Sequence, residues 1–193
     1  MNEKRDESST NVATGSVEWF KDLRSRVPLI LVGYRGNWCP FCKDYLKNFS
    51  TFMHLLSEQG FEVYGLTSQS NVIAEITKGA WKVGFMLYCC YENALPIYLK
   101  ESGICDVALT NRKDPTYSTG TMLQPFVLVT IPSRILYSWA SEPKNSNIDG
   151  AIGRPEPAEI VKYVIEERRK DKGPTTFKRL KTRSAVNAVC TIS

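Results

Sequence analysis

Two cysteines separated by two residues are the side chains in this sequence best suited to chemistry. They are Cys39 and Cys42, within the segment WCPFC at residues 38–42. A thiolate is a nucleophile, and two cysteines at this spacing can close a disulfide with each other within one helical turn. The flanking aromatic residues Trp38 and Phe41 would shield the sulfurs and offer a flat apolar docking surface. The pattern therefore predicts thiol–disulfide redox chemistry at Cys39 and Cys42.

A zinc half-site is the rival interpretation of this pair. Structural zinc is held by four ligands, so two more would be needed. The sequence has one histidine, His54, and the adjacent residues Cys89 and Cys90 do not have the spacing of a second zinc-binding pair. We therefore expect no metal and no cofactor, and we assign no catalytic role to His54.

A buried strand followed directly by a helix must position the two cysteines. Residues 28–34, PLILVGY, are continuously apolar, which is typical of a central strand buried on both faces. From residue 40 to residue 59 apolar side chains recur every three to four positions, which predicts a helix that ends at Gly60. Cys39 would lie at the N-terminus of this helix, where free N–H groups and the helix dipole lower the pKa of a thiol.

The rest of the chain alternates between strands and helices and then closes with a hairpin. Further strands are expected at residues 61–67, 83–87, 125–131 and 135–140, and further helices begin at Ser16 or span residues 70–78, 93–101 and 157–170. Val72, Ile73 and Ile76 should face the core, and residues 103–121 have the composition of a loop. This order predicts an α/β fold of three layers.

The chain divides into one domain with a polar segment at each end. Residues 1–15 are expected to be a disordered leader, residues 16–170 one domain and residues 171–193 a basic tail. From Arg168 to Ser193 the net charge is +7, which leaves −2 for the rest of a chain whose total is +5. No apolar stretch approaches the ~20 residues of a membrane helix, and no apolar signal core is present. We therefore expect a cytoplasmic protein.

The segment VGYRGNWCPFCKDYL, residues 32–46, resembles the peroxiredoxin-like branch of the alkyl hydroperoxide reductase/thiol-specific antioxidant family. Weaker similarity extends over residues 16–170. The resemblance implies a thioredoxin-like three-layer α/β/α fold with a central mixed sheet. It also implies that Pro125 follows a cis peptide bond, faces the cysteines and binds substrate, next to the docking surface of Trp38. The alternative is an ordinary trans proline at the start of a strand. Arg35 has two interpretations, either a positive charge that helps to bind substrate beside the thiolate or a solvent-facing loop residue.

The sequence departs from the peroxidase motif of typical peroxiredoxins, which runs proline, three residues, threonine, two residues, cysteine. Cys42 matches that cysteine, but Cys39 replaces the threonine and Arg35 the proline, and Gln124 stands where the family has an arginine. These departures favour dithiol–disulfide exchange over peroxide reduction. Two mechanisms stay open: Cys39 attacks a disulfide and Cys42 resolves it, or Cys42 attacks a hydroperoxide and Cys39 resolves it.

The resemblance also indicates partners for this chemistry. Substrates would be a protein disulfide or a small-molecule disulfide, with a hydroperoxide as a further candidate, and a dithiol reductant such as the thioredoxin or glutathione system would restore the thiols. The alternative is a non-enzymatic adaptor or redox sensor of thioredoxin-like fold, targeted to a membrane by its basic tail. We expect no nucleic-acid partner, because the tail lacks interleaved aromatic residues apart from Phe177.

The last four residues, CTIS, fit a prenylation pattern in which Cys190 carries a farnesyl group. A prenyl chain needs a second membrane signal, and Lys178, Arg179, Lys181 and Arg183 lie where a basic patch would supply it. On this interpretation the protein is held at an anionic membrane surface on its cytosolic side. The alternative is a basic tail that ends in an incidental cysteine.

Overall fold

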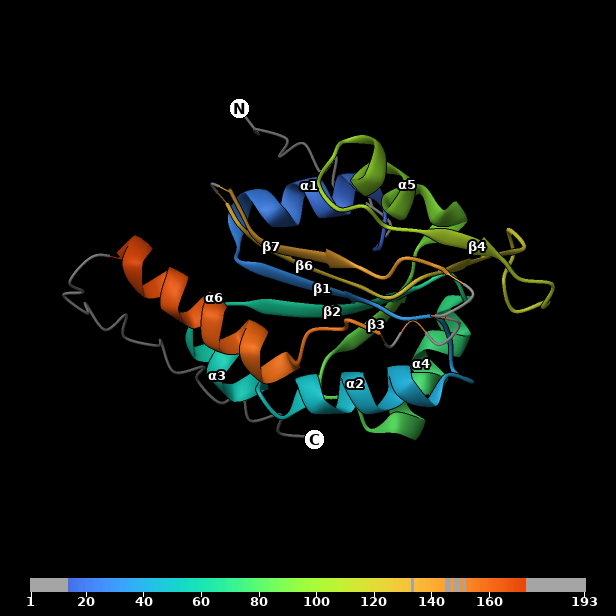
Figure 1. Cartoon of the computed structure of the whole chain (residues 1–193), viewed down its shortest axis with the longest axis horizontal. Helices are drawn as coiled ribbons and strands as arrows, with labels where there is room; N and C mark the ends of the chain where they lie inside the picture. Colours follow the sequence, from blue (N-terminus) through green and yellow to red (C-terminus); the bar gives the residue numbers. More distant parts are fainter. Residues whose placement is uncertain (1–13, 133, 145–146, 148–149, 151, 173–193) are drawn as a thin grey trace, which may run out of the picture.

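A five-stranded mixed sheet forms the centre of the protein (Figure 1). The structure, a computed structural model, describes residues 14–132, 134–144, 147, 150 and 152–172. The sheet has the order β3-β2-β1-β6-β7. Its strands are β1 (Leu29–Gly33), β2 (Glu62–Thr67), β3 (Met86–Cys89), β6 (Phe126–Ile131) and β7 (Arg134–Ala140). The first three run parallel, whereas β6 is antiparallel to β1 and β7 is antiparallel to β6.

Helices cover both faces of this sheet (Figure 1). One face carries α1 (Val17–Arg26) and α5 (Ala94–Glu101), and the short 3-10 turn η1 (Tyr91–Asn93) precedes α5. The other face carries α2 (Pro40–Ser50), α3 (Met53–Glu58), α4 (Asn71–Trp81) and α6 (Pro157–Lys172). The predicted thioredoxin-like three-layer α/β/α fold with a central mixed sheet is therefore confirmed.

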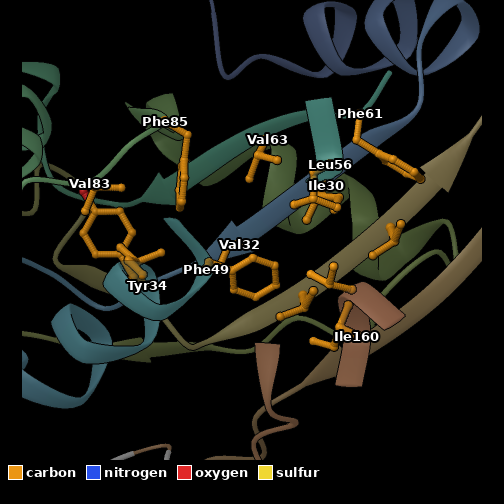
Figure 2. Packing of buried hydrophobic residues seen from close by; sticks show 14 of the residues in the cluster. Ile30, Val32, Tyr34, Phe49, Leu56, Phe61, Val63, Val83, Phe85 and Ile160 are labelled. Carbon is orange, nitrogen blue, oxygen red and sulfur yellow. The ribbon is translucent and has the colours of Figure 1, made fainter. Parts of the chain in front are cut away.

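The strand β1 explains why its sequence is continuously apolar. Alternate side chains of a strand point to opposite faces, and here both faces are covered by helices. Ile30 and Val32 pack with Phe49 of α2 and Ile160 of α6, as Figure 2 shows. Leu29 belongs instead to the cluster beneath α1 and α5. A strand buried on both sides gives the loop that follows it, and the cysteines beyond, a fixed starting point.

The prediction of one long helix over residues 40–59 is wrong in one respect, because this segment forms two helices. It is interrupted at Thr51 and Phe52, which separate α2 from α3. The Thr51 hydroxyl donates to the Asn48 carbonyl at 2.7 Å, and the Phe52 N–H bonds to the Phe49 carbonyl three residues back instead of four. Such local bonds compete with the α-helical pattern and bend the chain.

The predicted inward face of α4 is also wrong. Val72 and Ile76 are 66% and 59% exposed, Ile73 is half-buried, and the fully buried side chains are Ala74, Thr77 and Trp81. The Trp81 ring packs at 5.8 Å from that of Tyr34, just beyond the end of β1. Ala74, Thr77 and Trp81 therefore fill the space under this helix, and Val72 and Ile76 remain outside.

A second, two-stranded sheet lies where the sequence predicts only a loop. It pairs β4 (Leu109–Asn111) with β5 (Thr121–Leu123), antiparallel. Three-residue strands are too short to show an alternating pattern. The loop between them, residues 112–120, extends at the end of the main sheet from which α2 starts (Figure 1).

The ends of the chain are described only in part. The predicted leader and basic tail lie almost wholly outside the described residues, so the domain boundaries remain predictions. In the part of the chain that the structure describes, no helix is both long and apolar enough to span a bilayer.

Candidate active site

Cys39 lies at the start of α2, after the loop that leaves β1. It is the N-cap residue of the helix and has an extended backbone, with φ −88° and ψ 108°. Its sulfur accepts a hydrogen bond from the backbone N–H of Cys42 at 3.2 Å. Pro40 follows in the first turn, where its missing N–H leaves no helical hydrogen bond unmade. The free N–H groups and the dipole of the helix thus favour negative charge on the Cys39 sulfur.

The Arg35 side chain is buried against the same sulfur. Its Nη2 donates to Sγ of Cys39 at 3.3 Å, and the whole residue is only 3% exposed. Its guanidinium carbon also lies 5.0 Å from the centre of the Trp38 ring. The sequence leaves two interpretations open for Arg35, a positive charge beside the thiolate or a solvent-facing loop residue. In the structure Arg35 is buried and its charge lies beside the Cys39 sulfur.

The two sulfurs differ in how readily they ionise. A hydrogen bond from the Cys42 thiol, opposed by burial and reinforced by the Arg35 guanidinium, lowers the pKa of Cys39 to about 6. Burial, together with the hydrogen bond and negative charge at Cys39, raises the pKa of Cys42 well above its ordinary value. At neutral pH the pair therefore holds one thiolate, at Cys39, and one thiol, at Cys42.

A loop distant in sequence holds the segment between β1 and α2 in place. Tyr117, from the loop between β4 and β5, accepts a hydrogen bond from the indole N–H of Trp38 and donates one to the Arg35 carbonyl, each at 2.8 Å. Gly36 makes this approach possible, because a Cβ there would lie 2.3 Å from the Tyr117 hydroxyl oxygen. Arg112 of the same loop adds a second guanidinium, 4.5 Å from the centre of the Trp38 ring.

Gln69, just after β2, provides a second connection. Its amide oxygen accepts the backbone N–H of Asn37 at 2.8 Å, and its amide nitrogen donates to Oδ1 of Asn37 at 3.1 Å and to the Thr116 hydroxyl at 2.9 Å. The residue is 1% exposed. Sequence reasoning missed Gln69, Thr116 and Tyr117, because their contacts join positions 32 to 82 residues apart and no local pattern marks them.

Pro125 lies just before β6, next to the strand that leads to the cysteines. The neighbouring residue Phe126 pairs with Gly33, the last residue of β1. The described residues contain no cis peptide bond, so the prediction of a cis bond before Pro125 is wrong. Trans is the ordinary form of an X–Pro bond in folded proteins, where only about 5–6% are cis. The backbone N–H of Gln124 bonds to the Ala108 carbonyl at 2.9 Å, next to β4.

The sulfurs are covered, but aromatic residues beside them are exposed. Cys39 and Cys42 are 0% and 1% exposed, whereas Trp38 and Phe41 are 38% and 46% exposed. A shallow pocket of about 250 Å³ lies beside Phe41. Its lining residues are Phe41, Asp44, Tyr45, Asn48, Arg154 and Glu156. The surface beside the pair is therefore partly apolar and partly charged, and neither sulfur is reached without a local movement.

The other described cysteines have thiols that are less acidic than usual. Burial raises the pKa of Cys89, Cys90 and Cys105, and all the described cysteines are free thiols. Over the described ranges, no group of three or more His, Cys, Asp or Glu side chains is arranged to hold a metal ion. Cys190 and the nearby basic residues lie outside the described residues, so lipidation remains a prediction.

A comparison of the sequence with protein families supports the resemblance seen in it. A model described as the AhpC/TSA family matches residues 8–82, a segment that contains both Cys39 and Cys42. A search of curated proteins found no match.

Solved structures of peroxiredoxins share the fold. AhpC of Enterococcus faecalis is 14% identical with a TM-score of 0.55, over 80% of this chain and 83% of its own. Reduced Prx3 of Vibrio vulnificus, in complex with hydrogen peroxide, is 10% identical with a TM-score of 0.57, over 77% and 84%. Peroxiredoxin 6 of Arenicola marina, as a cysteine-to-serine mutant, is 13% identical with a TM-score of 0.57, over 84% and 71%. The chain therefore has the fold of these peroxiredoxins, and its segment 8–82 is similar to the AhpC/TSA family, in keeping with the resemblance in its sequence.

Proposed function

We propose that this protein is a thiol–disulfide oxidoreductase in which Cys39 and Cys42 cycle between a dithiol and a disulfide. The observation that carries the proposal is the unequal ionisation of the two sulfurs, with Arg35 and a helix N–H on Cys39. Only a thiolate attacks a disulfide at a useful rate, so Cys39 is the attacking sulfur. Cys42, which keeps its proton at rest, is the resolving sulfur.

The reaction takes two steps that conserve electrons. The Cys39 thiolate attacks one sulfur of a substrate disulfide, a bond forms between them, and the other substrate sulfur leaves as a thiolate that takes up a proton. Cys42 then loses its proton and attacks the Cys39 sulfur of this mixed disulfide, which releases the second substrate thiol. The substrate gains two electrons, and the protein is left with a Cys39–Cys42 disulfide.

Recognition of the substrate falls to the residues around the pair. Trp38 and Phe41 offer exposed apolar surface beside the sulfurs, and Pro125 lies at the neighbouring strand. These features suit a protein disulfide or a small apolar disulfide. A dithiol reductant, such as a thioredoxin or the glutathione system, returns the pair to the reduced state.

Peroxide reduction is the second candidate function. It is favoured by the match to the AhpC/TSA family, because Cys42 takes the place of the peroxide-attacking cysteine in that motif. The raised pKa of Cys42 opposes it, because the sulfur that would attack the peroxide keeps its proton. A third candidate, an adaptor with idle cysteines, would require both thiols to have ordinary pKa values, which the lowered pKa of Cys39 opposes.

The test is a stopped-flow comparison of the reduced protein against hydrogen peroxide and against a model aromatic disulfide. We expect the disulfide to react much faster. With Cys42→Ser the substrate should remain attached to Cys39, as a mass increase, and Cys39→Ser should not react. Cys89→Ser is the matched control and should retain most of the wild-type rate. If the protein reacts faster with hydrogen peroxide than with the disulfide, the peroxidase is favoured. If it reacts with both reagents no faster than free cysteine does, the adaptor is favoured.

A further inference from the structure

The Arg35 guanidinium is a positive charge inside the protein, and its environment changes when the cysteine pair is oxidised. The residue is 3% exposed, and its Nη2 lies 3.3 Å from the Cys39 sulfur. In the reduced protein that sulfur carries a negative charge beside the cation. In a Cys39–Cys42 disulfide the same sulfur is neutral. Oxidation therefore removes a charge–charge attraction from a site with little solvent to replace it.

The N-terminal end of α2 also stabilises the reduced form. The Cys42 N–H that donates to the Cys39 sulfur at 3.2 Å belongs to the first turn of α2, where the helix favours an anion. A disulfide sulfur is a weaker acceptor than a thiolate, because a hydrogen bond to a charged group is the stronger one. Both contacts to Cys39 thus stabilise the reduced form more than the oxidised form.

The backbone of Arg35 is held in place beside the cysteine pair. The Arg35 carbonyl accepts hydrogen bonds from Tyr117 at 2.8 Å and from the Thr67 hydroxyl at 3.5 Å. These bonds fix the backbone of Arg35 from two other parts of the fold. The guanidinium is therefore carried on a fixed backbone position beside the cysteine pair.

We propose that the Cys39–Cys42 pair is an oxidising couple, which accepts electrons from substrate dithiols and leaves them as disulfides. This inference rests on the proposed function. Both exchange steps are reversible, and the inference makes the reverse of the reduction described above the favoured direction, with a reduced dithiol as the substrate class. A pair whose reduced form is specifically stabilised has a higher reduction potential and is the stronger oxidant. Here Arg35 supplies that stabilisation.

Oxidation of the substrate dithiol takes two exchange steps. One thiolate of the substrate attacks the Cys39 sulfur, the Cys39–Cys42 bond breaks, and Cys42 takes the electron pair and a proton. The second substrate thiolate attacks its partner sulfur in the mixed disulfide, and Cys39 leaves as a thiolate beside Arg35. The substrate loses two electrons and two protons, one of which passes to solvent. A small-molecule disulfide such as oxidised glutathione re-oxidises the protein.

The test is the equilibrium of the full-length protein with mixtures of reduced and oxidised glutathione, read by mass after the thiols are trapped. We expect Arg35→Met to favour the disulfide at least tenfold over wild type, a fall of about 30 mV in reduction potential, and Arg35→Lys to recover part of this change. Arg26→Met, which removes an exposed charge on α1, is the matched control and should leave the equilibrium unchanged. Equal constants for Arg35→Met and wild type would overturn the proposal.

A measurement on the wild type alone covers the case in which Arg35→Met does not fold. Because the couple is oxidising, the reduced protein should unfold at a higher denaturant concentration than the disulfide form. The opposite order would overturn the inference while leaving the proposed function intact. If no Cys39–Cys42 disulfide forms in any glutathione mixture, the proposed function itself fails, and this inference fails with it.

Discussion

The Tyr117 hydroxyl accepts the indole N–H of Trp38 at 2.8 Å, although the two residues are 79 positions apart. The same oxygen donates to the Arg35 carbonyl, and Arg35 in turn contacts the Cys39 sulfur. One hydroxyl group therefore connects the loop between β4 and β5 to the reactive thiol. The chemistry of the cysteine pair thus depends on Tyr117, whose hydrogen bonds go to Trp38 and Arg35 and not to a sulfur.

Replacing Tyr117 with Phe removes both hydrogen bonds and keeps the ring. We expect the free energy of unfolding to fall by about 1–2 kcal/mol, since the Arg35 carbonyl is buried and loses a partner. The pKa of Cys39 should rise, because Arg35 is then held less firmly beside the sulfur. Denaturant unfolding and thiolate absorbance measure the two effects. Tyr163→Phe, at an exposed position of α6, is the control and should change neither.

Gly36 and Gly79 should respond to alanine in opposite ways. A Cβ at Gly36 would lie 2.3 Å from the Tyr117 hydroxyl oxygen and 2.7 Å from the Gln69 amide oxygen, so Gly36→Ala should destabilise the protein by about 1–3 kcal/mol. A Cβ at Gly79, inside α4, meets no atom within 4 Å, so Gly79→Ala should stabilise it by about 0.5–1 kcal/mol. Denaturant midpoints compare the two, and a stabilising Gly36→Ala would contradict the described contacts.

The extent to which the sequence predicts this fold differs from element to element. The strand β1 was predictable because it is buried on both faces, and α1 because Ser16 caps it, with its hydroxyl accepting the Trp19 N–H at 3.1 Å. The face of α4 was not predictable, because Val72 and Ile76 match an apolar stripe better than Ala74, Thr77 and Trp81 do. The buried stripe depends on tertiary contacts such as that of Trp81 with Tyr34, which lies far from this helix in the sequence.

The candidate site was predictable only as far as its local pattern extends. The spacing of Cys39 and Cys42 is a local signal, and the helix start follows from the strand before it. The contact between Arg35 and Cys39 depends on how the loop folds back, which composition does not determine. Tyr117 could not be found, because its role arises from the pairing of two three-residue strands that carry no periodic pattern of their own.

The pH dependence of alkylation should separate the two thiols. The pKa of Cys39 is lowered to about 6, so its thiolate forms as the pH rises through 6 and is lost below that value. Reaction of Cys39 with iodoacetamide should therefore rise through pH 6 and level off by pH 7. Cys42, whose pKa is raised, should stay unmodified until well above its ordinary range. In urea, both thiols should titrate near ~8.5. A folded Cys39 that also titrates there would contradict the described contacts.

The central claim is that Cys39 and Cys42 form a redox-active pair. Peptide mapping by mass spectrometry after mild oxidation of the full-length protein tests this claim most directly, because it locates the bond without assuming a substrate. We predict one disulfide between Cys39 and Cys42, reversed by a dithiol reductant, with Cys89, Cys90 and Cys105 still free. Both thiols of the pair found free after oxidation, or a disulfide that joins either one to another cysteine, would contradict the account.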